Sequence, residues 1–206
     1  MSDWTRIAPT RVDLVSGAME GATRHYQKRY ADLEGVFEDV AAFEARRAAA
    51  ADEVAYDVYE YRRSDDAGDL VFGTSRVYPG LVGREFNMTR GHAHVRGDRA
   101  ELYYCLSGHG VLLLQEPESA AQVVELYPGT AAYVPPFARH RSINVGHVPL
   151  VTLFCYPSDS GQDYDVVSGA HGMRLLVVRD PSGGWTVEEN PAYAPPTESA
   201  SPWPGR

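Results

Sequence analysis

The feature of this sequence that most constrains the fold is a long series of short apolar segments bounded by turn-forming residues. The segment VAYDVY at 54–59 has the period of two that places successive side chains on opposite faces of a β-strand. Gly, Pro and Asp clusters separate such segments, as hairpin connections require. Further candidate strands follow at 70–78, 84–94, 100–106, 110–115, 122–127, 130–135, 142–145, 149–156, 173–179 and 184–189. Many short strands at this spacing predict an all-β sandwich or small barrel.

The two ends of the chain differ from this central part. Residues 36–50, VFEDVAAFEARRAAA, combine good helix formers with apolar residues at helical spacing and predict one amphipathic helix. We therefore expect an N-terminal extension (residues 1–50) whose helix packs on a barrel formed by residues 51–190. Residues 191–206 are rich in Pro, Ser and Ala, which predicts a disordered tail that is dispensable for chemistry.

Charge and hydropathy argue against several classes of partner. The chain has 19 Lys plus Arg against 28 Asp plus Glu, a net charge of −9, which repels nucleic-acid backbones but leaves room for a local cationic pocket. Its apolar runs fall far short of the roughly 20 residues that span a bilayer, so we expect no membrane partner. The N-terminus lacks a secretory pattern, which predicts a cytoplasmic protein. Cys105 and Cys155 lie in apolar runs and are expected to be buried, reduced thiols.

The strongest functional signal is a set of metal-ligand residues. His92 and His94 are separated by one residue, so on a strand both imidazoles leave the same face. Glu101 follows across the Gly97-Asp98 turn, and a hairpin could return its carboxylate to that face. With His140, these residues form a donor set that suits Fe²⁺, Mn²⁺, Ni²⁺, Co²⁺ or Zn²⁺ and leaves positions open for water or substrate.

Two spaced motifs surround these residues and resemble the two motifs of the cupin superfamily. They comprise Glu101 with Gly108, and then Gly129, Pro135, His140 and Asn144. The loop from His94 to Glu101 is longer than in most cupins, and Phe137 replaces a usual glycine. The resemblance implies a single cupin (jelly-roll-like) antiparallel β-barrel with a short N-terminal helical segment and a disordered C-terminal tail.

Longer segments narrow the resemblance to the cupin-type glucose-6-phosphate isomerases of archaea and some bacteria, in which the longer loop is usual. The similarity is dense over about residues 50–168 and is carried by GDLVFGTSRVYPGLVGREF, TRGHAHVRGDRAELYYCLSGHGVLLLQ, YPGTAAYVPPFARHRSINVGHVPLV and YPSDSGQDYD. It implies a metal-dependent enzyme that interconverts glucose 6-phosphate and fructose 6-phosphate. It also implies a homodimer and one divalent metal per subunit, with Fe²⁺ expected first and Mn²⁺, Ni²⁺, Zn²⁺ and Co²⁺ as alternatives.

The resemblance also implies roles for individual residues by position. His92, His94, Glu101 and His140 match the metal ligands, and Thr89 and Gly91 fall in the loop that binds the substrate phosphate. Ser75 stands where a phosphate-binding threonine is usual. Tyr56, Tyr103 and Tyr156 match aromatic positions that line the sugar-phosphate pocket, although each tyrosine could equally be core packing. Arg90 adds a cation beside the phosphate loop, and Arg139 and Arg141 are given no role.

The reaction that the resemblance implies requires residues of these types. Aldose–ketose isomerisation moves a hydrogen between C1 and C2 while charge develops on two adjacent oxygens, which a Lewis-acidic metal stabilises. Glu101 is the candidate for relaying the proton. A hydride shift between the two carbons is the competing route.

One departure from the family keeps other functions open. Gln162 stands where the family has a histidine near the sugar, and glutamine can form hydrogen bonds but does not titrate. The alternatives are an isomerase or epimerase of a different phosphorylated sugar, and a non-catalytic sugar-phosphate-binding cupin. A metal-dependent dioxygenase is a further alternative, because the same ligand set supports oxygen chemistry elsewhere.

Overall fold

The chain folds as the predicted antiparallel β-barrel. A computed structural model describes residues 9–116 and 121–195, and strands dominate this part of the chain. Within it, the helical elements are α1 (Val40–Ala50), the four-residue α2 (Asp165–Ser168) and a short 3₁₀ turn (Tyr30–Asp32). None of the described helices has the length and apolarity needed to cross a membrane.

The largest sheet has six antiparallel strands in the order β11-β8-β13-β5-β4-β3. This sheet forms one wall of the interior. Side chains along β8 point alternately inward and outward, so Glu101, Tyr103 and Cys105 are buried while Leu102 and Tyr104 are exposed. In chain order the strands are β3 (Arg24–Arg29), β4 (Val54–Arg62), β5 (Leu70–Val77), β8 (Glu101–Ser107), β11 (Ala131–Val134) and β13 (Leu150–Pro157).

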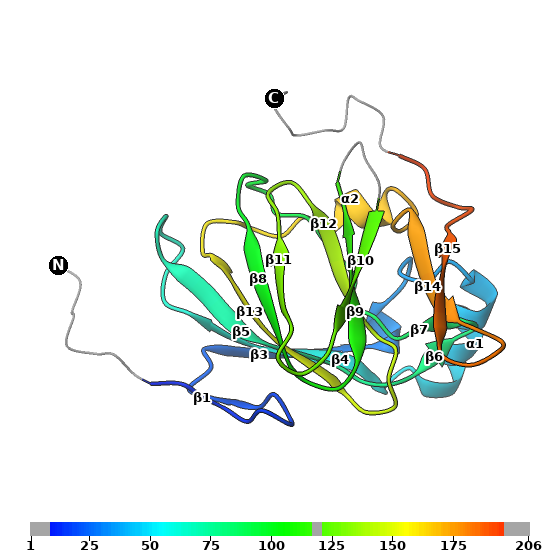
Figure 1. Cartoon of the computed structure of the whole chain (residues 1–206), viewed down its shortest axis with the longest axis horizontal. Helices are drawn as coiled ribbons and strands as arrows, with labels where there is room; N and C mark the ends of the chain where they lie inside the picture. The colour runs from blue at the N-terminus through cyan, green and yellow to red at the C-terminus, as the bar shows by residue number, and fades with distance from the viewer. Residues whose placement is uncertain (1–8, 117–120, 196–206) are drawn as a thin grey trace.

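A second wall comes from β9 (Gly110–Gln115), β10 (Ala121–Leu126) and β12 (Arg139–Asn144), which pair in the order β10-β9-β12 (Figure 1). Beside it stands a four-stranded sheet of β6 (Leu81–Val82), β7 (Glu85–Phe86), β14 (Leu175–Arg179) and β15 (Trp185–Glu189). A small hairpin of β1 (Arg11–Val12) and β2 (Met19–Glu20) precedes the barrel. Buried side chains from both walls form a continuous apolar core.

The predicted helix is real but begins later than expected. Asp39 accepts a hydrogen bond from the Ala42 amide at 2.9 Å and caps the helix, so α1 starts at Val40 rather than at Val36. Val36 is nevertheless buried with Phe43, whereas Val40 is exposed. Val36 and Phe43, two of the apolar residues on which the helix prediction rests, therefore both reach the core. Val36 does so from the segment before the helix, and Phe43 from the helix itself.

The predicted strand over 84–94 is wrong for most of its length. Only Glu85 and Phe86 form a strand, and beyond them the chain makes isolated bridges, such as Met88 to Ile143 and His92 to His140. Gly91 has a φ of +77°, a left-handed conformation that interrupts any regular strand. The sequence also gave no indication of β3, which adds an outer strand to the six-stranded sheet by pairing with β4.

The first residues of the predicted tail are attached to the barrel. Gln115 Nε2 donates a hydrogen bond to the Tyr193 hydroxyl at 2.7 Å, and the Ala194 amide donates to the Ala170 carbonyl. Residues 196–206, on which the rest of the tail prediction falls, lie outside the described part of the chain.

Packing between the walls makes Leu112 a sensitive probe of the fold. Leu112 in β9 is fully buried, so Leu112→Ala should lower the free energy of unfolding by about 2–5 kcal/mol, through lost transfer energy and the cavity left behind. Leu102→Ala is the matched control, because Leu102 is 43% exposed and should cost at most about 0.5 kcal/mol. Urea denaturation of both variants checks this, and equal losses would contradict it.

Candidate metal centre and adjoining pocket

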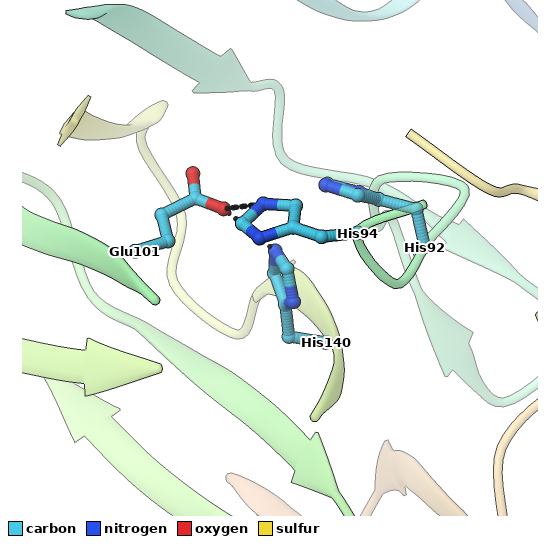
Figure 2. Close-up of side chains that lie close together, drawn as sticks. All are labelled: His92, His94, Glu101 and His140. Carbon is cyan, nitrogen blue, oxygen red and sulfur yellow. Dashed lines mark hydrogen bonds and ion pairs between the residues drawn. The ribbon is translucent and has the colours of Figure 1, made fainter. Parts of the chain in front are cut away.

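Four buried side chains from separate parts of the sequence meet inside the barrel. His92 and His94 lie in the loop before β8, Glu101 is the first residue of β8, and His140 is the second residue of β12. Their ligand atoms all lie within 4.8 Å of one another, and Figure 2 shows the four side chains converging. The structure thus gathers the four predicted ligands, although His92 and His94 reach the site from an irregular segment rather than a strand.

Hydrogen bonds orient these rings as a metal site would require. His94 Nδ1–H donates to the Arg99 carbonyl at 2.9 Å, which leaves Nε2 facing Glu101 Oε2 at 3.2 Å. His140 Nε2 lies 3.0 Å from the same oxygen, a close contact that can be followed in Figure 2. This contact lacks hydrogen-bond geometry, and His92 Nε2 has no hydrogen-bond partner among the described residues. Buried nitrogen atoms left without hydrogen bonds around one carboxylate fit a divalent transition metal.

The electrostatics of the cluster keep its donors available. Burial would raise the pKa of Glu101, but its close contacts with the His140 and His94 rings outweigh burial and lower that pKa to about 2, so the carboxylate stays ionised. Burial and the neighbouring His140 lower the pKa of His92 well below its usual range, and its ring stays neutral. For His94, burial opposes protonation, but the Glu101 carboxylate raises the pKa.

A solvent-open pocket adjoins the cluster, with His92 and Glu101 in its wall. Residues far apart in the sequence line it, and every substrate residue predicted from the sequence is among them: Tyr56, Ser75, Thr89, Gly91, Tyr103, Tyr156 and Gln162. The six-stranded sheet supplies the floor through inward-facing residues of β4, β5, β8 and β13. Residues 89–92, Gln162, Tyr164 and Tyr26 of β3 supply the rest of the lining.

The pocket is rich in hydrogen-bond donors. The buried Ser75 hydroxyl has no partner among the described residues, and Thr89 Oγ1 already accepts from the Ser142 amide at 3.1 Å, so its own proton is free to be donated. Burial raises the pKa values of Tyr56, Tyr103 and Tyr156, which therefore remain protonated at neutral pH. This chemistry suits an oxygen-rich, anionic ligand.

Sequence reasoning missed several lining residues. Glu60 is buried, accepting from Arg62 Nε at 3.2 Å and from the Tyr156 hydroxyl at 3.5 Å. It follows Tyr56 by four positions on a period-two strand, so its facing could have been inferred. Tyr164, which donates to Gln162 Oε1 at 2.6 Å, is two residues beyond a predicted site residue. Tyr26 comes from β3, a strand without a clear sequence signal.

Phe137 shows what the departure from the cupin glycine means structurally. Its φ is +70°, the left-handed region that glycine adopts without steric cost and that L side chains rarely occupy. The Phe137 amide donates to the Gly97 carbonyl, and His140 enters the site a few residues later. The turn before β12 therefore keeps a glycine-like backbone conformation despite the bulky side chain.

The cysteines take no part in the cluster or the pocket. Cys105 and Cys155 are both free thiols, as expected, but only Cys105 is buried; Cys155 is half-buried, so the prediction of burial is wrong for Cys155. Burial raises the pKa of Cys105 to about 11, so this thiol is a poor nucleophile.

Together the fold and the cluster define a class: an antiparallel β-barrel of the cupin type with a His₃Glu ligand set inside. A family model described as glucose-6-phosphate isomerase (GPI) matches residues 27–194. The chain belongs to this glucose-6-phosphate isomerase family.

Similar proteins agree with that assignment. The chain is 49% identical to the glucose-6-phosphate isomerase of Sinorhizobium medicae over 90% of this chain and 87% of that protein. It is 40% identical to the glucose-6-phosphate isomerase of Pyrococcus furiosus over 89% of this chain and 95% of that protein. An oxalate oxidase solved with glycolate aligns with a TM-score of 0.46 and 14% identity, over 55% of this chain and 57% of that one, a likeness too small to bear on function.

The cluster geometry predicts how metal binding responds to mutation. His140→Ala should lower the affinity for a divalent transition metal at least about tenfold, because it removes one of four converging donors. The measurement is metal content by mass spectrometry after chelation and reloading with Fe²⁺ or Mn²⁺. His147→Ala, an exposed histidine outside the cluster, should bind metal like the unmodified protein. Equal metal loss in both variants would contradict the site.

Proposed function

We propose that this protein is a metal-dependent isomerase that interconverts glucose 6-phosphate and fructose 6-phosphate. The observation that carries the proposal is that His92 and Glu101 belong both to the four-donor cluster and to the wall of the donor-rich pocket. A small ligand in that pocket therefore lies against the metal-ligand set. Membership of the glucose-6-phosphate isomerase family supports the same reaction.

Different residues contribute to different parts of the proposed reaction. A divalent ion held by His92, His94, Glu101 and His140 supplies Lewis-acid stabilisation of the charge that develops on O1 and O2 of the sugar. Tyr103 and Tyr156 stay protonated. Tyr103 donates a hydrogen bond to a sugar oxygen, whereas the Tyr156 hydroxyl, which donates to Glu60, accepts one from a sugar hydroxyl. Ser75, Thr89 and the Gly91 amide hold the phosphate and so fix the distance from C1 and C2 to Glu101.

Glu101 relays the proton between C1 and C2. Its contacts with His94 and His140 hold its pKa at about 2, and so weak a base would accept a carbon-bound proton poorly. These contacts therefore oppose a relay through Glu101. A hydride shift between C1 and C2 does not use Glu101 as a base, and the lowered pKa of Glu101 is the observation that favours testing this second route.

Three further properties belong to the proposal and rest on the family resemblance. Fe²⁺ is the proposed ion, although Mn²⁺, Ni²⁺, Co²⁺ and Zn²⁺ satisfy the same donors. The proposed assembly is a homodimer, which light scattering tests. The proposed compartment is the cytoplasm, where phosphorylated sugars are metabolised.

Isomerisation in D₂O tests the reaction and the relay together. Chelated protein reloaded separately with Fe²⁺, Mn²⁺, Ni²⁺ and Zn²⁺ should convert fructose 6-phosphate to glucose 6-phosphate that carries deuterium at C2. Glu101→Gln should lower kcat at least about 100-fold, since it removes the relaying carboxylate. Turnover without deuterium would overturn the relay and favour the hydride shift.

Controls separate this function from the alternatives. His92→Ala should lose the metal-dependent rate, because it removes a ligand. Metal-loaded protein that binds fructose 6-phosphate without turnover would contradict the isomerase and point to a different phosphorylated sugar or a binding role. Oxygen consumption with a diketone or thiol substrate would instead favour a dioxygenase.

Gln162 predicts an unusual pH dependence. Since glutamine does not titrate, the rate profile of this protein should lack an inflection from an imidazole at that position. Gln162→His introduces a group with an ordinary pKa near 6.5 and keeps an acceptor for the Tyr164 hydroxyl, so a new inflection should appear between about pH 6 and 7. Profiles of kcat/KM for both proteins check this, and superimposable profiles would refute a role for residue 162 in proton transfer.

A further inference from the structure

Arg141 is a fully enclosed cation with no role in the scheme above. It follows His140 on β12, so its side chain leaves the opposite side of the strand from the metal-ligand set. It is only 4% exposed, and it lies against the segment that carries Thr89 and Gly91. Its Nη1 donates to Met88 Sδ at 3.0 Å and its Nη2 to the Arg90 carbonyl at 2.7 Å.

The bond from Arg141 to the Arg90 carbonyl orients the next amide. The Arg90 carbonyl and the Gly91 N–H belong to one peptide unit, which is trans, so the two groups point in opposite directions. Since Arg141 holds the carbonyl, the Gly91 N–H points away from the guanidinium. Within the described part of the chain this amide donates to no protein acceptor, and Gly91 lines the pocket.

Gly91 and Arg141 also constrain each other sterically. Gly91 has a φ of +77°, and a Cβ placed there would lie 2.9 Å from Arg141 Nε and 3.3 Å from Arg141 Cβ. A side chain at residue 91 would therefore displace the guanidinium as well as strain the backbone. The bare glycine allows Arg141 to pack directly behind the pocket wall.

Arg141 makes no direct ion pair. No carboxylate lies within 4.0 Å of its guanidinium nitrogen atoms among the described residues, and its Nε–H has no hydrogen-bond partner there. The charge of the buried Glu85 carboxylate favours the Arg141 cation from beyond that distance, while Glu85 accepts a hydrogen bond from the Glu38 amide at 2.7 Å. An enclosed cation without a direct ion pair is costly, and an anion bound at the adjacent pocket wall would offset part of that cost.

We propose that Arg141 is a positioning residue of the phosphate subsite, which aims the Gly91 amide into the pocket and supplies positive charge behind it. The identity of the ligand as a sugar phosphate rests on the proposed function. Together with Arg90, which lines the pocket, this charge explains how a chain of net charge −9 attracts a dianion locally.

The test compares Arg141→Met and Arg141→Lys with Arg139→Met in the metal-loaded, full-length protein. Arg139 is a matched control on the same strand, 3% exposed, whose guanidinium donates to the Tyr193 hydroxyl rather than to residues 88–91. The probes are inorganic phosphate, by titration calorimetry, and fructose 6-phosphate, by steady-state kinetics. Metal content is measured for every variant.

Arg141→Met should raise the Kd for phosphate and the KM for fructose 6-phosphate at least about tenfold, with kcat changed less than about threefold and metal content unchanged. Arg141→Lys keeps the charge but loses the planar fork, so it should show an intermediate rise of about threefold or more. Arg139→Met should bind phosphate like the unmodified protein.

Several results would overturn the proposal: no phosphate binding by the unmodified protein, unchanged phosphate affinity in Arg141→Met, or an equal loss in Arg139→Met. If Arg141→Met does not fold, an unchanged affinity in Arg141→Lys overturns it. Phosphate binding that depends on Arg141 in a protein without isomerase activity would support the subsite and refute the proposed function, so the two failures are distinguishable.

Discussion

The site depends on a reciprocal pair of backbone hydrogen bonds between His92 and His140. The His92 amide donates to the His140 carbonyl at 3.1 Å, and the His140 amide donates to the His92 carbonyl at 2.9 Å. This short bridge fixes the irregular loop against β12 and sets two imidazoles beside each other. Because the loop is fixed there, His94 faces Glu101 and the residues before His92 line the pocket.

The same backbone bridge connects the candidate metal centre with the pocket, and these two sites need different electrostatic surroundings. The metal-ligand set is buried and carries the ionised Glu101, whereas a phosphate subsite needs donors and positive charge. In the proposed function residues 89–92 serve both, since His92 belongs to the cluster and Gly91 lines the pocket. Successive residues of β12 do the same, with His140 in the cluster and Arg141 against the loop. Successive side chains of an extended chain point to opposite sides. A cation and the nitrogen atoms of the candidate metal ligands can therefore lie within a few residues of each other in the sequence without being in contact.

Much of the fold and the metal site could be predicted from the sequence. Period-two segments and turn residues located the main strands, and the spacing of His92, His94, Glu101 and His140 indicated a shared ligand set. The prediction failed where local pattern did not decide backbone conformation. Residues 84–94 were predicted as one strand, but Gly91 is left-handed and only isolated bridges join this segment to β12, so most of it is a loop. Tyr26 in β3 was missed because its polar neighbours RHYQKR carry no clear alternation.

The sequence by itself determined the strand-rich class, the chemical types of the candidate metal donors and the presence of a side chain at Gln162 that does not titrate, because these depend on residue type and short spacing. Only the tertiary structure decided that Glu60, Tyr26 and Tyr164 share the pocket with the predicted residues, and that Arg141 lies behind Gly91. These contacts join residues on different strands. Their proximity depends on sheet register and on how the walls close around the interior, which no local pattern in one chain specifies.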